Sequence, residues 1–173
     1  RVFKIEGRAR GPEYVRTVVE CYKEAVTAYC EDSFTEEKVA IWDGRLASVF
    51  NRGFWDGYYL GQRLGEWSSN YGSGATKRKV YIGKGLKYFS NLGVAEFLME
   101  TQSLKVGDEI LITGPTTGAL FQTVDEIRVD LESVEETVKG DKFSIKVSDK
   151  IRPSDKLFKM IKVEQKKKFV EKI

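Results

Sequence analysis

Four charged side chains near the N-terminus are the residues best suited to chemistry. Lys4 lies among the β-favouring residues 2–5, and the other three charged residues follow that segment: Glu6, Arg8 and Arg10. The segment predicts a strand, along which alternation places Lys4, Glu6 and Arg8 on one side. Because guanidinium groups bind carboxylates and phosphates in a bidentate manner, we expect Lys4, Arg8 and Arg10 to bind an anionic substrate. Glu6 is the candidate general acid or base. An internal network of these charges that only closes a barrel is the alternative.

The elements that must position these side chains are a strand and two helices. Pro12 stands where a first helical turn tolerates proline, and apolar residues recur at helical spacing from there to about Glu31. A capping box at Ser33–Glu36 predicts a second amphipathic helix that ends near Phe50. Neither helix can bury its apolar stripe within so short a segment. We therefore expect both stripes to pack on the rest of a larger protein, or on another copy of this chain.

A second candidate site combines a cation with aromatic rings after the second helix. Its residues are Asn51, Arg52, Phe54, Trp55, Tyr58 and Tyr59. Stacking rings beside a cation are typical of proteins that bind single-stranded nucleic acid, and Arg52 is the substrate-binding residue we single out. Packing between two domains is the alternative role of the rings. Residues 51–74 as a whole are predicted to be an aromatic loop followed by a linker rich in glycine and serine.

Residues 75–165 have the pattern of a small β-domain. Six short β-rich runs separated by turns predict a closed six-stranded barrel. Basic and aromatic residues gather on its first run and could form one face, and we expect them to bind RNA. They are Lys77, Arg78, Lys79, Tyr81 and Lys84. Charged residues on an exposed strand also serve solubility alone, which is the alternative explanation.

Composition limits the chemistry that this chain can perform. It contains no histidine, which removes Ser–His and Cys–His nucleophiles and every His-ligated metal site. Cys21 and Cys30 are nine residues apart, so a helix places them on opposite faces, and we expect structural thiols. A net charge of +3 means that any basic surface is local. With no apolar run of membrane-spanning length we expect no membrane contact and a cytoplasmic protein, with residues 166–173 as a basic tail.

Three segments, residues 3–15, 50–54 and 75–110, resemble the C-terminal part of the collagenase-like peptidase family U-32. The resemblance implies that this chain, which has no initiator methionine, is part of a longer protein. On this interpretation residues 1–50 are the last strand and helices of the parent's catalytic α/β barrel. Residues 75–165 are similar to the family's C-terminal β-barrel, which resembles the second domain of translation elongation factors. The expected fold class is therefore α+β.

The resemblance also implies two activities. Members were named as proteases, and relatives are implicated in hydroxylating RNA, either a tRNA wobble uridine with prephenate or a ribosomal cytidine, with cysteines that bind an iron–sulfur cluster. The family's signature segment with its cysteines is missing here, so we expect no cofactor in this chain and place such a cluster in the N-terminal part of the parent. Neither Cys21 nor Cys30 falls in that motif.

The function we expect is recognition of RNA, tRNA or rRNA, for a hydroxylating enzyme. The parent is then an enzyme and this chain is inactive alone, because most of the catalytic barrel is missing from it. Two alternatives remain open. One is the C-terminal domain of a collagenase-like protease that binds polypeptide, and the other is a non-catalytic adaptor that binds a protein partner. The uncovered helical stripes also predict self-association of the chain.

Overall fold

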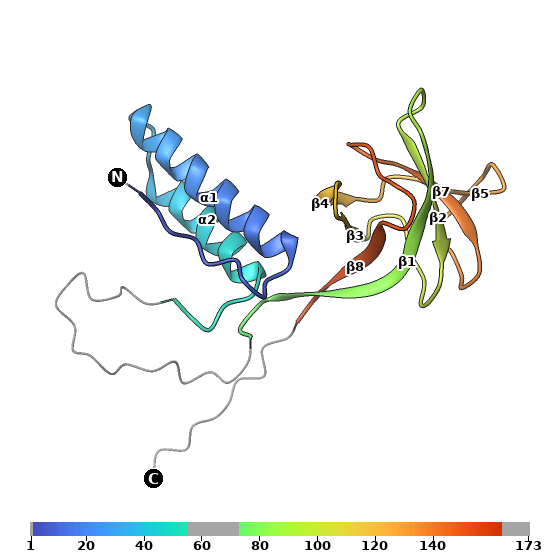
Figure 1. Cartoon of the computed structure of the whole chain (residues 1–173), viewed down its shortest axis with the longest axis horizontal. Helices are drawn as coiled ribbons and strands as arrows, with labels where there is room; N and C mark the ends of the chain where they lie inside the picture. Colours follow the sequence, from blue (N-terminus) through green and yellow to red (C-terminus); the bar gives the residue numbers. More distant parts are fainter. Residues whose placement is uncertain (1, 55–72, 164–173) are drawn as a thin grey trace, which may run out of the picture. The chain divides into compact units, whose positions relative to one another are not determined.

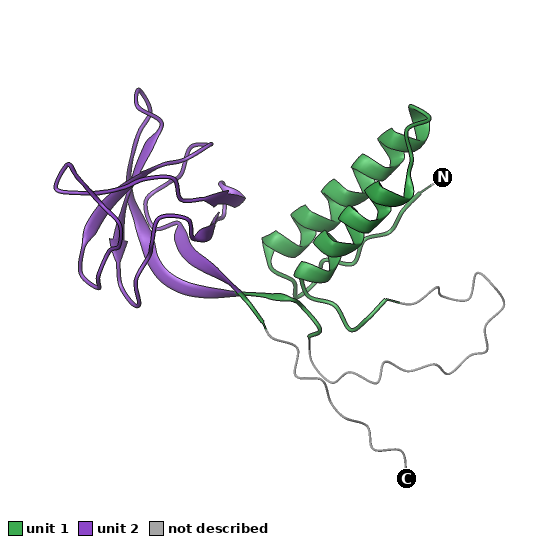
Figure 2. Ribbon diagram, turned by 180° about the vertical axis from the view of Figure 1, so that it is seen from behind, with its two compact units in different colours: residues 1–78, 162–173 green, residues 79–161 purple. Residues whose placement is uncertain are grey.

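A computed structural model describes residues 2–54 and 73–163 of the chain. The chain divides into two compact units, Arg1–Arg78 with Lys162–Ile173, and Lys79–Ile161 (Figure 2). The predicted rings Trp55, Tyr58 and Tyr59, most of the predicted linker and the basic tail lie outside the described residues. No described helix combines the length and apolar character that crossing a membrane requires.

Two helices form the body of the first unit (Figure 1). Helix α1 spans Pro12–Cys30 and begins at proline, as predicted, because the amide that proline lacks would have no partner in the first turn. Helix α2 spans Glu36–Ser48, and its N-cap is Thr35, whose hydroxyl accepts a hydrogen bond from the Lys38 amide at 3.4 Å. The predicted capping box at Ser33–Glu36 is wrong by two residues, since the Ser33 hydroxyl instead donates to the Ala28 carbonyl.

Helix α1 carries two apolar stripes, and α2 covers one of them. Cys21 and Ala28 of α1 are buried against Trp42 of α2, with exposed fractions of 8% or less. The second stripe recurs at alternating spacings of four and three residues and remains exposed: Val15, Val19, Tyr22, Val26 and Tyr29. The helices therefore bury one stripe on each other, which the sequence did not predict, and leave the second stripe open.

The predicted N-terminal strand is not formed. Residues 2–7 have no regular secondary structure, and the chain turns at Arg8 and Ala9. A strand needs a neighbour to satisfy its backbone N–H and C=O groups, and the described part of the chain pairs no strand with residues 2–5. The segment is held by side-chain packing, with the Phe3 ring 5.6 Å from that of Tyr22.

The β-strands form one sheet of eight, in the order β4-β3-β8-β1-β2-β7-β5-β6. Strand β3 pairs antiparallel with β4 and β8, β2 with β1 and β7, and β5 with β6 and β7. The strands are β1 (Lys77–Phe89), β2 (Val94–Met99), β3 (Glu109–Gly114), β4 (Gly118–Thr123), β5 (Ile127–Val129), β6 (Glu132–Val134), β7 (Lys142–Lys146) and β8 (Lys156–Lys162).

The predicted closed barrel of six strands is wrong in strand number and in closure. Residues 119–129 are divided between β4 and β5, because Val124 turns into the core and its backbone bonds to residues 107 and 108. Strand β6 was not predicted. Among the described strands no pairing joins the two edges, β4 and β6. Near β4 the Gln122 side chain instead bonds the carbonyl of Lys146 and the amide of Ser148.

The sheet curls around one hydrophobic core. Side chains from strands far apart in the sheet order meet there, including Ile82 of β1, Ile112 of β3, Leu120 of β4 and the stacked rings of Phe97 and Phe143. Those two rings lie 5.7 Å apart and are almost fully buried. The core thus links all the central strands of the second unit.

Replacing Phe97 with alanine tests this core. We expect Phe97→Ala to lower the free energy of unfolding of the second unit by about 3–5 kcal/mol, because it removes a ring that the surroundings cannot refill. Phe54→Ala is the control, since that ring is 62% exposed, and should cost less than about 0.5 kcal/mol. Urea titration followed by circular dichroism measures both. Equal losses in the two variants would contradict the assigned core.

The turn between β5 and β6 contains an unusual leucine. Asp130 and Leu131 have φ angles of 49° and 71°, in the left-handed region that such two-residue turns usually fill with Asn-Gly. Leu131 is nevertheless 87% exposed, so no packing in the described residues compensates for its conformation. The left-handed backbone costs a side chain with a Cβ about 1–2 kcal/mol.

Glycine at this position should therefore stabilise the second unit. We expect Leu131→Gly to raise the free energy of unfolding by about 1 kcal/mol, because relief of the left-handed conformation outweighs the greater flexibility of unfolded glycine. Leu92→Gly is the matched control, an exposed leucine on another turn whose φ is not positive. It should lower stability slightly. Urea titration compares the two, and the same sign of change in both would refute the assignment of strain.

Candidate functional site

The predicted N-terminal site is only partly assembled. Glu6 accepts a hydrogen bond from the Arg8 amide at 3.0 Å, and the side-chain atoms Arg8 Nε and Glu6 Oε1 are 3.8 Å apart. The Arg10 guanidinium lies 3.6 Å above the centre of the Phe50 ring, and Lys4 is exposed. Because the strand is absent, backbone alternation does not align these side chains. Their roles in substrate binding and proton transfer stay predictions.

Arg52 lies in an irregular segment that follows α2. The Asn51 side-chain amide bonds the carbonyls of Ala47 and Val49 at 3.2 and 3.0 Å, which ends the helix and directs the chain away from it. Arg52 and Phe54 are exposed. The other rings predicted beside Arg52 lie outside the described residues, so the proposed aromatic site stays a prediction.

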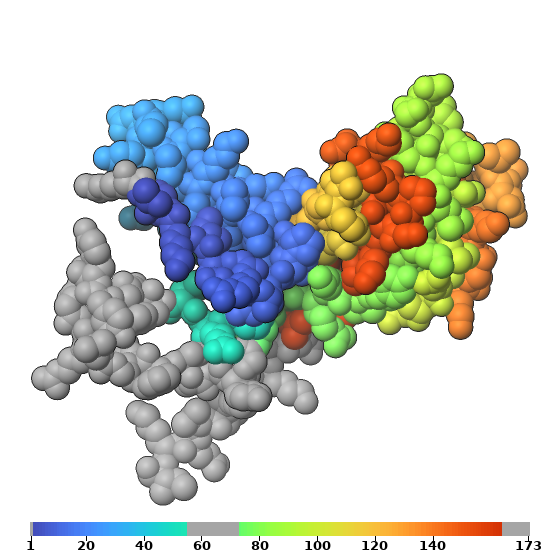
Figure 3. Space-filling model, in the orientation of Figure 1, coloured from blue at the N-terminus to red at the C-terminus, as the bar shows by residue number. Residues whose placement is uncertain are grey.

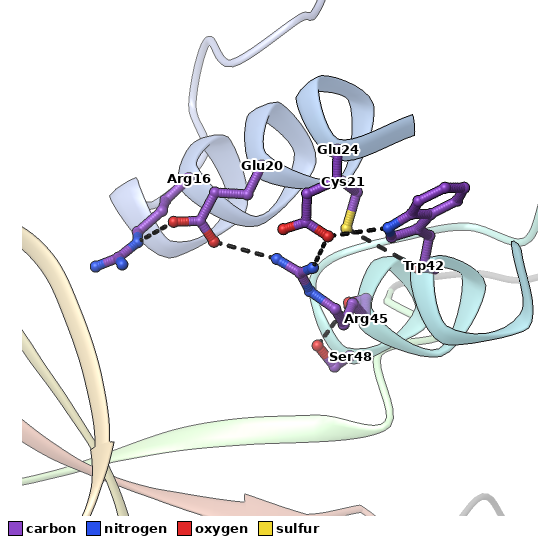
Figure 4. A network of polar contacts seen from close by, with 7 residues as sticks. All are labelled: Arg16, Glu20, Cys21, Glu24, Trp42, Arg45 and Ser48. Carbon is purple, nitrogen blue, oxygen red and sulfur yellow. Dashed lines mark hydrogen bonds and ion pairs between the residues drawn. The ribbon is translucent and has the colours of Figure 1, made fainter. Parts of the chain in front are cut away.

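A polar network holds the two helices together (Figure 4). Arg45 of α2 contacts two carboxylates of α1, Glu24 at 2.6 Å and Glu20 at 3.2 Å. The Trp42 indole donates a hydrogen bond to Glu24 at 2.9 Å, and Arg16 pairs with Glu20 at 2.7 Å. Sequence spacing predicts the contact between Arg16 and Glu20, which are four residues apart on one helix. The contacts between the two helices depend on tertiary packing, and no sequence motif predicts them.

This network sets the protonation of the groups around it. The hydrogen bond from Arg45 lowers the pKa of Glu24 below its ordinary value. Burial raises the pKa of the Cys21 thiol, whose Sγ lies 4.0 Å from the Trp42 carbonyl. A buried thiol with a raised pKa is a poor nucleophile. The arrangement is therefore suited to joining helices rather than to covalent catalysis.

The predicted RNA-binding residues all lie on β1, and two of them meet at one aromatic ring. Lys79 Nζ lies 5.1 Å from the centre of the Phe158 ring, and the Tyr81 ring meets the same ring edge-on at 5.7 Å. Phe158 belongs to β8, the neighbour of β1 in the sheet. Lys77 and Arg78 occupy the first two positions of β1. The sequence grouped Lys79 and Tyr81 in one basic, aromatic run but did not identify Phe158, which comes from a distant strand.

Lys84 and Tyr81 also share a carboxylate. Lys84 Nζ is 2.8 Å from Glu100, and the Tyr81 hydroxyl donates a hydrogen bond to the same side chain. Burial and this bond raise the pKa of Tyr81 to about 12, while the hydrogen bonds from Lys84 and Tyr81 lower the pKa of Glu100. Tyr81 is therefore neutral at physiological pH. The charge of Lys84 is offset by Glu100.

A groove of about 600 Å³ lies beside two hairpins of the second unit, and sequence patterns did not reveal it. We call it the hairpin groove. It is lined by Phe89, Leu92, Val94, Glu96, Glu126, Arg128, Asp130, Leu131, Lys142, Ser144, Ile145 and Lys146. Figure 3 shows both hairpins at the surface of the second unit, β1–β2 in green and β5–β6 in orange. The volume of the hairpin groove is within the usual range of ligand-binding pockets, about 300–1,000 Å³.

The described residues do not fit an iron–sulfur cluster. They contain no group of three or more His, Cys, Asp or Glu side chains that could hold a metal ion. Cys21 is buried between the helices and Cys30 is exposed at the end of α1. A cluster needs several thiolates directed at one point, which these two cysteines do not provide.

Comparisons with known proteins place this chain beside longer relatives. It is 64% identical over 165 residues to a collagenase of Porphyromonas gingivalis, and the match covers 95% of this chain and 40% of that protein. It is 30% identical over 159 residues to an uncharacterized protease of Methanocaldococcus jannaschii, covering 90% and 39%. It is 29% identical over 163 residues to tRNA hydroxylation protein P1 of Bacillus subtilis, covering 90% and 37%. The chain thus spans less than half the length of these relatives.

Among solved structures, the chain is similar to the C-terminal domain of a putative U32 peptidase of Geobacillus thermoleovorans. The match has 20% identity and a TM-score of 0.44, and covers 46% of this chain and 90% of that domain.

The fold and its surfaces define an α+β protein in which a helical pair accompanies a curled antiparallel sheet. Residues 1–69 match the model of Peptidase family U32. Together with the identity to the collagenases, this match confirms the predicted resemblance to that family.

The pKa of Glu24 predicts how pH affects the helices. A carboxylate whose pKa is lower in the folded than in the unfolded state stabilises the fold above its unfolded pKa, and this contribution is lost as the pH falls through the folded pKa. We expect the helical circular dichroism to melt at lower temperature as the pH falls below the ordinary value of 4.5. Glu24→Gln should reduce this pH dependence, and Glu31→Gln should leave it unchanged. An identical pH dependence in all three proteins would contradict the role of Glu24.

Proposed function

We propose that this chain is the RNA-recognition part of a longer enzyme that hydroxylates tRNA or rRNA. The observation that carries the proposal is the contact of Lys79 and Tyr81 with the ring of Phe158. A cation beside aromatic rings on a sheet is the combination that proteins use for single-stranded nucleic acid, in which bases stack on rings and cations meet phosphates. The tRNA hydroxylation protein of Bacillus subtilis, which aligns over 90% of this chain, supports the choice of RNA.

The sheet extends this aromatic contact across further strands. Phe158 of β8 is opposite Leu111 of β3, which is opposite Phe121 of β4. Residues directly opposite each other in antiparallel strands project from the same face, so the two phenylalanines share a face with the leucine between them. Lys156 is two residues before Phe158 and therefore lies on that face as well. Leu111 is fully buried, so the groups of this face that RNA could contact are the two phenylalanines and the lysines near Phe158.

The remaining candidate residues have supporting roles in this proposal. Lys4, Arg8, Arg10 and Arg52 bind anionic groups of the RNA or of a small substrate, because cations of this kind pair with phosphate and carboxylate. Glu6 serves as general acid or base. The iron–sulfur cluster of the proposed enzyme belongs to the N-terminal part of the longer protein. The proposed likeness of the second unit to the second domain of translation elongation factors agrees with an RNA-binding role.

Recognition of polypeptide by a protease is the second candidate function. The collagenase of Porphyromonas gingivalis, which is 64% identical over 165 residues, favours it. The hairpin groove offers apolar side chains of the kind that a polypeptide could contact. A non-catalytic adaptor that binds a protein partner is the remaining alternative.

Binding of unmodified tRNA measured by fluorescence anisotropy at several salt concentrations tests the first candidate. We expect Lys79→Ala to weaken binding and to reduce the slope of log affinity against log salt by about 0.7–0.9, the value of one phosphate contact. Phe158→Leu keeps an apolar side chain but removes the ring, so it should weaken binding without changing that slope. Lys139→Ala is the control, because this lysine is exposed on the turn before β7.

Three outcomes discriminate the candidates. Equal binding by wild type, Lys79→Ala and Phe158→Leu would contradict the proposed RNA surface. Retention of denatured collagen by a chain that does not bind tRNA would favour the protease. A chain that binds neither polymer would leave the adaptor.

A further inference from the structure

Two strongly exposed leucine side chains lie at the hairpin groove. Leu92 on the β1–β2 turn is 70% exposed and Leu131 on the β5–β6 turn is 87% exposed, and both line the groove with Phe89 and Val94. Contiguous exposed apolar groups of this kind mark interaction surfaces in soluble proteins. No segment among the described residues covers these apolar side chains.

Leu131 is held at the groove against its backbone preference. Its φ of 71° would suit glycine or asparagine, yet the position carries a large apolar side chain in solvent. Strained backbone conformations of this kind concentrate at binding surfaces, where the side chain contributes outside the folded monomer. The stability of the single chain therefore does not explain why a leucine occupies this position.

The charges at the groove identify its occupant. Arg128 is already paired with Glu126 at 2.8 Å. Within the described part of the chain, two carboxylates and two ammonium groups that line the groove make no ion pair: Glu96, Asp130, Lys142 and Lys146. The charged side chains of the lining sum to zero, so the groove has no net attraction for a polyanion such as RNA. A surface that carries groups of both signs can meet a second copy of itself across a two-fold axis with each group beside one of opposite sign.

We propose that the hairpin groove is the interface with a second copy of this chain. Leu131 of each copy inserts into the groove of the other, beside Phe89 and Leu92, and the carboxylates of one copy meet the lysines of the other. The contact is isologous, so each residue acts twice in the dimer. The proposal is independent of the RNA surface on β1 and β8, and it differs from self-association through the exposed stripe of α1.

Sedimentation equilibrium of the 173-residue chain tests the interface. We expect a concentration-dependent dimer, and we expect Leu131→Gly to weaken dimerisation by about tenfold while its unfolding midpoint stays the same or rises. A loss of association without a loss of stability separates an interface residue from a structural one. Val26→Ser, which changes the exposed stripe of α1, is the matched control and should dimerise like wild type.

Charge reversal gives a second test of the same interface. We expect the double variant Glu96→Lys/Asp130→Lys and the double variant Lys142→Glu/Lys146→Glu each to sediment as monomers, and their equal mixture to form a heterodimer. A wild-type chain that is monomeric at its highest soluble concentration would overturn the proposal. So would a Leu131→Gly variant that dimerises as tightly as wild type, weakening by Val26→Ser alone, or a mixture of charge variants that stays monomeric.

Discussion

The pairing of β2 with β7 is the constraint on which the second unit depends. Phe97 and Phe143 are directly opposite each other in this pair, and their rings stack at the centre of the core. Since side chains alternate between the faces of a strand, a slip of one residue in either strand would turn that strand's ring to the outer face and bring its polar residues inward. The same alternation places Glu96 and Ser144 opposite each other on the groove side. One stacked pair therefore fixes the core and the composition of the groove together.

Local patterns predicted the helices well, because their boundaries depend on residues close in sequence. Pro12 sets the start of α1 and apolar spacing its extent, and the predicted end of α2 near Phe50 lies two residues beyond Ser48. The N-cap of α2 is Thr35 rather than the predicted Ser33, because the Ser33 hydroxyl donates a hydrogen bond to a carbonyl of α1. The predicted N-terminal strand is absent for a different reason. Residues 2–5 have strand propensity, but a strand requires a partner that the described chain does not supply.

The sheet and its surfaces were predictable only in part. The sequence singled out Lys79 and Tyr81 as members of one basic, aromatic run, whereas their shared contact with Phe158 depends on which strand becomes the neighbour of β1. The offset of Lys84 by Glu100 likewise depends on the β1–β2 pairing. The groove and the left-handed Leu131 had no sequence signal, because leucine is not a residue that marks a tight turn. Tertiary neighbours, rather than propensity, decide each of these features.

The side chain of Gln122 has a consequence for the motions of the sheet. It joins the edge strand β4 to the end of β7 through two hydrogen bonds, where backbone ladders join the other neighbours. A single amide resists separation far less than a ladder does, so we expect the sheet to open at this seam more readily than along its ladders. Solvent would reach Leu120 and its core neighbours first through that opening. We therefore expect β4 to separate from the end of β7 before the stacked rings of Phe97 and Phe143 part.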